Sequence, residues 1–465
     1  MKTVRHTSRT AIFLVVMLFS SVAGAQIYSG TGALKLDPFP RELGLKAGNF
    51  NIQPYLNVGY GYDSNLFYND DTQWEKPTGS QLVKIVPGLK VINLNTRNLE
   101  LNFGGSALID QYISDNKAAK KQSNVGGDAK IAATFFKASP VSLRVSEQFR
   151  RALERRNSES NKNYNRNVNR VGAGVVFKPG GGALEMGVDY AFVADMFADV
   201  EDDWGDLLYH DITLKGSWKF FPYTALVLDG NWQARSYEHK DMGRYGELTP
   251  SKPLRVRFGL NGFITRKLSV MALVGYGNSF HEQRVTADLN PSENDSFNMV
   301  IGEARVSARF SPNTIVQGGY QFDFKDSTWT NYVQYHKFYV NFQQRLLNRV
   351  DLVADVSYFI KDYSQLPKAY FEAATDKTIA GSFYGLLTGY ERRDLVLHAR
   401  LKAVVDITRF LAFEASYNME LNNEPLNSSG KFGTCMEAGC EDPATFRDYV
   451  AYKRHFVLGS LILRY

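Results

Sequence analysis

The sequence predicts an all-β chain that forms a transmembrane, antiparallel, up-and-down β-barrel. Three observations lead to this prediction: segments of strictly alternating polarity, connections that alternate between short and long, and a last strand that runs to the final aromatic residue. The composition agrees, because aromatic residues make up 13% of the 465 residues and only 15 residues are proline. Aromatic side chains favour strands, and proline disrupts them.

Residues 1–25 are predicted to be a signal peptide. MKTVRHTSRT contains three basic residues, AIFLVVMLFSSV is apolar, and AGAQ supplies small residues for cleavage between Ala25 and Gln26. The apolar block is shorter than the roughly 20 residues that a spanning helix needs. Cleavage lowers the formal charge from +6 to +3, and no basic run remains that is typical of nucleic-acid binding. We therefore expect Sec-type export and no nucleic-acid partner.

Residues 51–465 are predicted to form the barrel, because alternation begins at residue 51 and recurs to the end. In NIQPYLNVGYGYD, alternate residues from Ile52 to Tyr62 are apolar or aromatic, and those from Gln53 to Gly61 are mostly polar or small. The same period recurs in ELNFGGSALIDQY, ALEMGVDYAF, KPLRVRFGLNGFI and IGEARVSARF. Period two is typical of strands with one apolar face. Residues 26–50 lack it and are predicted to be a short periplasmic segment.

The connections separate a membrane barrel from a Greek-key sandwich. Short connections are expected near residues 95–98, 137–140, 179–182, 221–224, 265–267, 311–313, 347–349 and 407–410. Long polar loops lie between them, as in SNLFYNDDTQWEKPTGS, EHKDMGRYGELTPS and HEQRVTADLNPSEND. Short periplasmic turns and long extracellular loops are typical of outer-membrane barrels, whereas a sandwich has no reason to sort its loops by length.

Counting segments between these connections gives about 18 strands, with 16 to 20 compatible. The predicted starts are residues 51, 80, 98, 123, 140, 164, 183, 207, 224, 251, 268, 296, 314, 331, 350, 381, 410 and 446. An even number places both ends at the periplasmic side. The count depends on residues 379–409, which we interpret as one long strand. A hairpin at Arg392–Arg393 is the alternative and would change the parity.

Aromatic residues are expected to form two girdles at the membrane interfaces, which amphipathic rings prefer. The girdle near the short turns would contain Phe135, Phe177, Trp218, Phe220, Phe310 and Phe413. The girdle near the loops would contain Tyr60, Tyr62, Tyr190, Trp232, Tyr276, Tyr320, Tyr358 and Tyr417. Membrane lipid and lipopolysaccharide are therefore expected to surround the chain in the outer membrane of a Gram-negative bacterium.

The polar face of each strand is expected to line a wide, aqueous lumen. By strand phase, its candidate residues are Arg144, Arg170, Lys215, Arg235, Arg255, Arg257, Arg305, Arg309, Arg345, Arg400, Lys402, Asp189, Asp229, Glu303, Asp323 and Asp355. The same phase adds Lys337, Asp110, Asp128, Glu185, Asp406 and Glu414. The slight excess of basic side chains favours anionic solutes, because Arg binds carboxylates. Alternatively, these charges pair across strands and only solvate the lumen.

The sequence contains no motif for an enzyme, a cofactor or a metal. G-x-S-x-G and H-E-x-x-H are absent, and His210 and Asp211 are neighbours on a predicted strand, so they point to opposite faces. Cys435 and Cys440 are predicted to form a disulfide, because the exported chain meets an oxidising compartment.

The first strand and its loop, IQPYLNVGYGYDSNLFYND, carry a resemblance to a known family. Pro54 to Phe67, with GYGYDSN at residues 59–65, resembles the opening of the β-barrel porin 2 family. The resemblance implies an outer-membrane exit pore for an exopolysaccharide or capsular polysaccharide, working with a periplasmic polysaccharide-export protein. The physical alternative is that Asp63, Ser64 and Asn65 only turn the chain out of the strand.

We therefore expect a polysaccharide-export channel, with a general diffusion porin for small hydrophilic solutes as the alternative. A barrel hydrolase and a surface adhesin are less favoured. A loop-end cluster of Asp, His and Ser would favour the hydrolase.

The last segment, HFVLGSLILRY, predicts how the barrel closes. Its lipid-facing residues would be Val457, Gly459, Leu461, Leu463 and Tyr465. Residues 446–465 are expected to pair with residues 51–62, because a barrel leaves no free edge. The terminal aromatic residue also resembles the end that the barrel-assembly machinery recognises.

Overall fold

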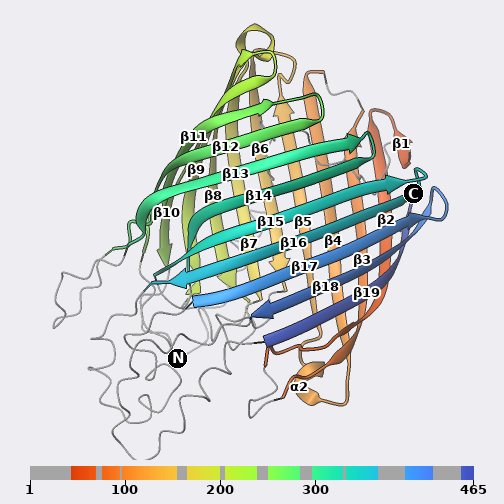
Figure 1. Cartoon of the computed structure of the whole chain (residues 1–465). Helices are drawn as coiled ribbons and strands as arrows, with labels where there is room; N and C mark the ends of the chain where they lie inside the picture. Colours follow the sequence, from red (N-terminus) through yellow and green to blue (C-terminus); the bar gives the residue numbers. More distant parts are fainter. Residues whose placement is uncertain are drawn as a thin grey trace, which may run out of the picture.

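The computed structural model describes residues 43–69, 76–94, 97–153, 165–198, 205–237, 250–282, 296–327, 331–364, 393–422 and 452–465. These residues form one antiparallel β-barrel (Figure 1). Its first nine strands are β2 (Phe50–Asp63), β3 (Ser80–Asn93), β4 (Leu99–Ile113), β5 (Asn124–Phe135), β6 (Val141–Ala152), β7 (Arg166–Phe177), β8 (Leu184–Phe197), β9 (Leu207–Phe221) and β10 (Thr224–Tyr237).

The remaining nine are β11 (Leu254–Phe263), β12 (Leu268–Asn278), β13 (Asn298–Ser311), β14 (Thr314–Asp326), β15 (Tyr332–Leu346), β16 (Val350–Tyr363), β17 (Arg393–Asp406), β18 (Leu411–Asn422) and β19 (Tyr452–Arg464). The expected 18-strand, up-and-down barrel is therefore confirmed.

The barrel closes where its last strand meets its first. β19 pairs antiparallel with β2, from Phe456 opposite Asp63 to Arg464 opposite Tyr55. Every other pair joins strands that follow each other in sequence. The predicted pairing of the C-terminal segment with the first strand is confirmed, and both strand ends lie on the side of the short turns.

Residues 379–409, on which the predicted number of strands depends, contribute one described strand. β17 begins at Arg393 and pairs with β16 along its whole length. Residues 365–392 lie outside the described part of the chain, and so does the predicted upper half of a long strand. The even count nevertheless holds, because β16, β17 and β18 are consecutive neighbours in the sheet.

The outer face of the barrel is apolar, as the alternation predicts. On β19, Val457, Leu461 and Leu463 are about half exposed, and on β11 Phe258 and Leu260 are as well. The predicted interface aromatic residues Trp218, Phe310, Tyr60, Tyr62 and Tyr276 are also exposed. Exposed apolar side chains around a closed barrel need lipid as their surroundings. The chain is thus an outer-membrane barrel, located in the outer membrane of a Gram-negative bacterium.

Three short elements were not expected from the alternation. They are β1 (Leu45–Ala47), α2 (Lys117–Lys120) and the 3-10 turn η1 (Pro179–Gly182). β1 pairs with residues 50–52 of β2, just beyond the point where β19 ends. Leu43 marks the inner side of this hairpin, because its carbonyl accepts hydrogen bonds from the inward side chains of Asn51 and Gln53.

Residues 1–42, with the predicted signal peptide and its cleavage site, lie outside the described part of the chain. The cysteine pair Cys435–Cys440 does too. No helix among the described residues is long and apolar enough to span a membrane.

Candidate functional site

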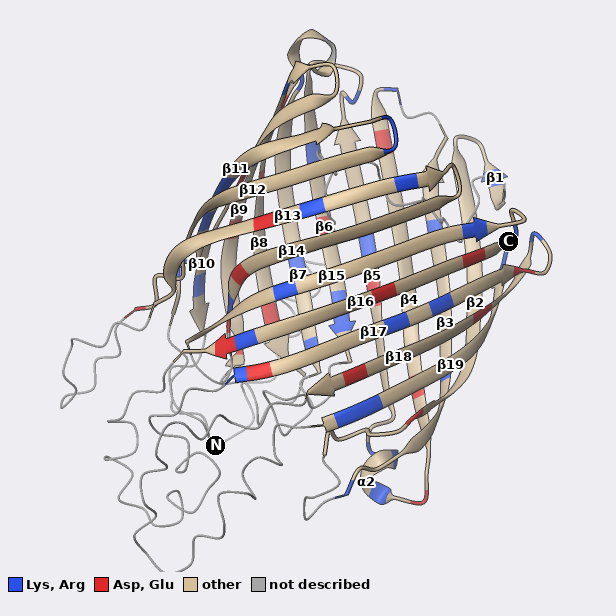
Figure 2. Ribbon diagram, viewed as in Figure 1, with Lys and Arg blue, Asp and Glu red and all other residues tan. Residues whose placement is uncertain are grey.

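The inner wall of the barrel is the candidate site, and ion pairs across it show which side chains face inward. Arg144 on β6 donates to both carboxylate oxygens of Asp189 on β8, at 2.7 Å each, past the intervening strand β7. Arg235 on β10 lies 2.9 Å from Asp326 at the end of β14. Contacts that skip strands form only on the concave side of a barrel. Figure 2 shows charged residues of both signs along the strands.

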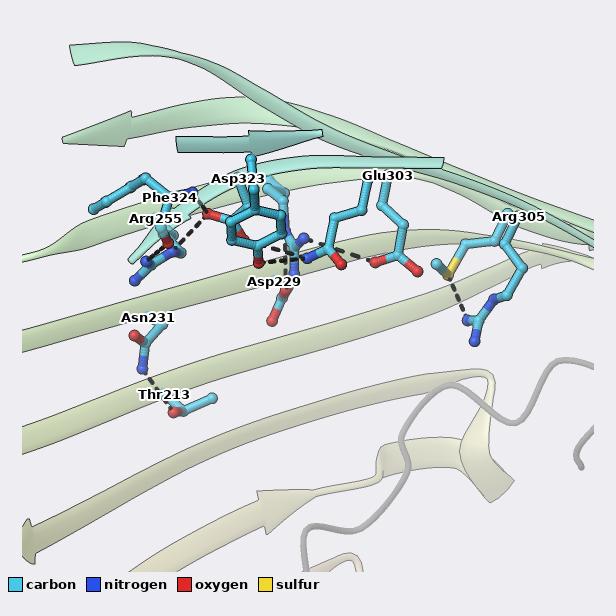
Figure 3. A network of polar contacts seen from close by, with 12 residues as sticks. Thr213, Asp229, Asn231, Arg255, Glu303, Arg305, Asp323 and Phe324 are labelled. Carbon is cyan, nitrogen blue, oxygen red and sulfur yellow. Dashed lines mark hydrogen bonds and ion pairs between the residues drawn. The ribbon is translucent and has the colours of Figure 1, made fainter. Parts of the chain in front are cut away.

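A larger network joins β10, β11, β13 and β14 (Figure 3). Arg255 Nε lies 2.9 Å from Asp323 Oδ1, and its guanidinium lies 4.0 Å from the centre of the Phe324 ring. Arg257 pairs with Asp229 and lies 3.7 Å from Glu303. The arginine–carboxylate contacts fix these side chains against the wall.

Further candidate residues are paired in the same way. Arg170 lies 2.8 Å from Asp211, Arg345 lies 2.6 Å from Asp351, and Lys402 lies 2.5 Å from Glu414. Arg309 also interacts with other groups of the protein. For Arg170, Arg345 and Lys402 the structure favours the alternative interpretation, in which charges pair across strands.

Four of the predicted basic residues differ from the rest. Within the described part of the chain, Lys215, Arg305, Lys337 and Arg400 form no ion pair with a carboxylate. Among the described residues, Arg305 donates to the sulfur of Met271, at 3.1 Å, and Figure 3 shows it apart from the ion-pair network. Asp355, directly opposite Arg400 in register, instead accepts a hydrogen bond from Asn341. The sequence could not reveal this difference, because pairing depends on which strands face each other.

Water reaches the inner wall. The inward side chains of Lys84, Arg170 and Asp189, which lie within their strands, keep 27%, 26% and 33% of their surface exposed although they belong to ion pairs. In a barrel packed shut, these side chains would be buried. The described strands therefore enclose a polar, hydrated space.

No protein-family model matches the chain, and a search of the curated proteins finds no match. Among solved structures, the chain is similar to OccAB3 of Acinetobacter baumannii, with a TM-score of 0.45 and 11% identity over 90% of this chain and 100% of that one. It is also similar to OccK9 (OpdG) of Pseudomonas aeruginosa, with a TM-score of 0.46 and 9% identity over 90% of this chain and 99% of that one. For the outer membrane protein OpdK of Pseudomonas aeruginosa, the TM-score is 0.43 and the identity is 9%, over 89% of this chain and 99% of that one.

The residues that carry the resemblance to the β-barrel porin 2 family close the barrel seam at its loop end. Asp63 is fully buried and forms a two-pronged ion pair with Arg454 of β19, at 3.0 and 2.6 Å. Ser64 exchanges two hydrogen bonds with the backbone of His455, and Asn65 donates to the Lys453 carbonyl. We call residues 63–65 the seam clasp.

After the seam clasp, the chain folds onto the inner wall. Leu66 is almost fully buried and packs with Leu82 of β3 and Tyr112 of β4. The hydroxyl of Tyr68 accepts a hydrogen bond from Arg454, and the Tyr68 ring packs edge-on against Tyr452. The alternative that Asp63, Ser64 and Asn65 only turn the chain out of the strand is therefore incomplete, because these residues also bind β19 and the chain after them folds inward.

Serine, histidine and aspartate lie at the loop end, but in two separate hydrogen bonds and not in the Ser–His–Asp relay that a hydrolase uses. Ser251 Oγ lies 2.5 Å from Asp326, and His281 Nδ1 lies 2.9 Å from Ser279 Oγ. Both serines are fully buried, and Asp326 already pairs with Arg235. These hydrogen bonds tie loop ends together. Among the described residues, no three His, Cys, Asp or Glu side chains group to hold a metal.

Proposed function

We propose that the chain is an outer-membrane diffusion channel for small hydrophilic solutes and that its lumen prefers anions. One observation carries the proposal: most inward carboxylates form ion pairs with basic side chains, whereas Lys215, Arg305, Lys337 and Arg400 have no carboxylate partner among the described residues. A paired carboxylate presents little net field to a passing ion. An unpaired guanidinium or ammonium presents its full charge, and field lines concentrate in a narrow low-dielectric pore.

The proposal predicts anion selectivity that depends on the unpaired cations. Purified protein in planar bilayers under a KCl gradient should give a reversal potential of the sign expected for chloride. The double variant Lys215→Gln, Arg305→Gln should move this potential toward zero, because two uncompensated charges are lost. Raising the salt concentration should weaken the selectivity through screening.

Lys267→Gln supplies the control, because Lys267 lies in an exposed turn. It should leave the reversal potential unchanged. Cation selectivity in the wild-type channel, or an equal shift in the control, would contradict the proposal.

Polysaccharide export is a second proposal, which rests on the resemblance at residues 54–67 and on inward aromatic rings. The ammonium of Lys337 lies 5.2 Å from the ring centre of Tyr339 and 5.4 Å from that of Phe359. Aromatic faces of this kind can stack on sugar rings. This proposal includes a periplasmic export protein as partner and a polysaccharide as cargo.

Deletion of the gene separates the two proposals. A diffusion channel predicts slower uptake of small anions and intact surface polysaccharide. Loss of surface polysaccharide with unchanged uptake would favour export instead. Recognition of the C-terminal strand by the assembly machinery and the absence of catalysis remain predictions in both cases.

A further inference from the structure

A pocket in the lumen wall lies over β16 to β19. It has a volume of about 420 Å³, and its lining includes Asp355, Ser357, His398, Arg400, Asn418, Glu420 and Arg454. This volume lies within the range of small-molecule sites. Most of the lining side chains are polar and inward by strand phase, so a solute in the lumen meets them.

The pocket holds opposite charges that do not neutralise each other. Asp355 and Arg400 are direct cross-strand partners, a position in which side chains usually touch. Asn341 on the far side of β16 instead donates a hydrogen bond to Asp355 and holds that carboxylate toward β15. Arg400 stays exposed and forms no ion pair among the described residues. The pocket thus presents one cation and one anion on adjacent strands.

The other charges of the pocket are already engaged. Arg454 pairs with Asp63 of the seam clasp, at 2.6 Å. Glu420 accepts a hydrogen bond from Tyr452 and also lies 4.0 Å from Arg454, whereas Asp355 has no basic partner among the described residues. His398 lies 3.6 Å from Glu420. Arg400 and Asp355 therefore remain the groups best placed to receive a ligand, with Ser357 and Asn418 as neutral hydrogen-bonding neighbours.

We infer that this pocket is a binding subsite for zwitterionic solutes of the amino-acid type. The Arg400 guanidinium would receive the solute carboxylate, and Asp355 would receive the ammonium group. Both contacts are charge-assisted hydrogen bonds, which need opposite charges a few bonds apart in the ligand. The inference rests on the proposed diffusion channel and adds the solute class that the channel retains in transit.

Blockade of single-channel current tests the inference with three related probes. L-alanine has both charges, L-lactate replaces the ammonium with a hydroxyl, and L-alaninamide lacks the carboxylate. The half-blocking concentration of alanine should be about tenfold lower than that of either analogue, as expected for one lost charge-assisted contact.

Two variants test which side chain binds each charged group of the ligand. Asp355→Asn should raise the half-blocking concentration of alanine about tenfold and leave that of lactate unchanged, and Arg400→Gln should raise both. Lys267→Gln should change neither. Because Asn can replace Asp355 without loss of volume, a heat-resistant folded band on a gel should verify that the variant barrel forms.

The reversal potential of the same membranes separates the two proposals. A chloride-selective channel that blocks equally with alanine and lactate would overturn the zwitterion site alone. Alanine blockade that is insensitive to Asp355→Asn would do the same. A channel without anion preference would contradict the proposed function, whatever the blockade shows.

Discussion

At the scale of single residues, inward glycines decide how closely neighbouring strands approach. Gly275 on β12 lies opposite Arg257 on β11, and a Cβ there would lie 1.8 Å from the Val256 carbonyl oxygen. Backbone cannot move aside as a flexible side chain can. The absence of a side chain at Gly275 therefore sets the position of Arg257 and, through it, the ion pairs to Asp229 and Glu303.

Gly275→Ala should destabilise the barrel by about 1–3 kcal/mol, the usual cost of overpacking. Urea unfolding in lipid vesicles, followed by tryptophan fluorescence, measures this change. Gly104→Ala is the matched control, because a Cβ at Gly104 would meet only the Leu89 carbonyl oxygen, at 3.8 Å. Equal unfolding midpoints for the two variants would contradict the assigned role of Gly275.

At the scale of elements, the seam between β2 and β19 differs from the other strand pairs because no chain connection joins these strands locally. The seam clasp supplies that connection through Asp63, Ser64 and Asn65. Its ion pair is largely buried, with 0% of Asp63 and 16% of the Arg454 side chain exposed. Loss of one partner leaves a buried charge uncompensated, which is much more costly than loss of a surface pair.

Asp63→Asn should therefore lower the free energy of unfolding by about 3–5 kcal/mol. Asp362→Asn removes the same charge from the exposed pair with Arg393 and should cost about 1 kcal/mol or less. Urea titrations of both variants in vesicles check the difference. If Asp362→Asn is as destabilising as Asp63→Asn, the seam clasp does not close the barrel.

The elements themselves were largely predictable from the sequence, whereas their long-range contacts were not. Residues 80, 207, 224, 268, 314 and 350 were predicted starts and begin β3, β9, β10, β12, β14 and β16. Alternation and turn residues are local signals. The partner of Arg235 is Asp326, four strands away, and depends on the curvature and shear of the closed wall. The inward fold of the first loop escaped prediction for the same reason.

At the scale of the whole molecule, the membrane defines a depth that each strand crosses. Replacing two equally exposed side chains by Arg should therefore cost different amounts of stability at different depths. The cost of Arg on the lipid face falls from the midplane to the interface. Val274 in the middle of β12 and Ile407 in a short turn after β17 form such a pair, with 51% and 52% of their surface exposed.

Val274→Arg should lower the free energy of unfolding by about 2–4 kcal/mol, and Ile407→Arg by about 0–1 kcal/mol. Urea unfolding in vesicles provides the comparison, since lipid is present in the folded reference state. In detergent micelles, whose apolar region deforms more easily, the difference should shrink. Equal costs in vesicles would mean that Val274 does not face the hydrocarbon region, and the outer belt of the barrel would have to be placed at another height.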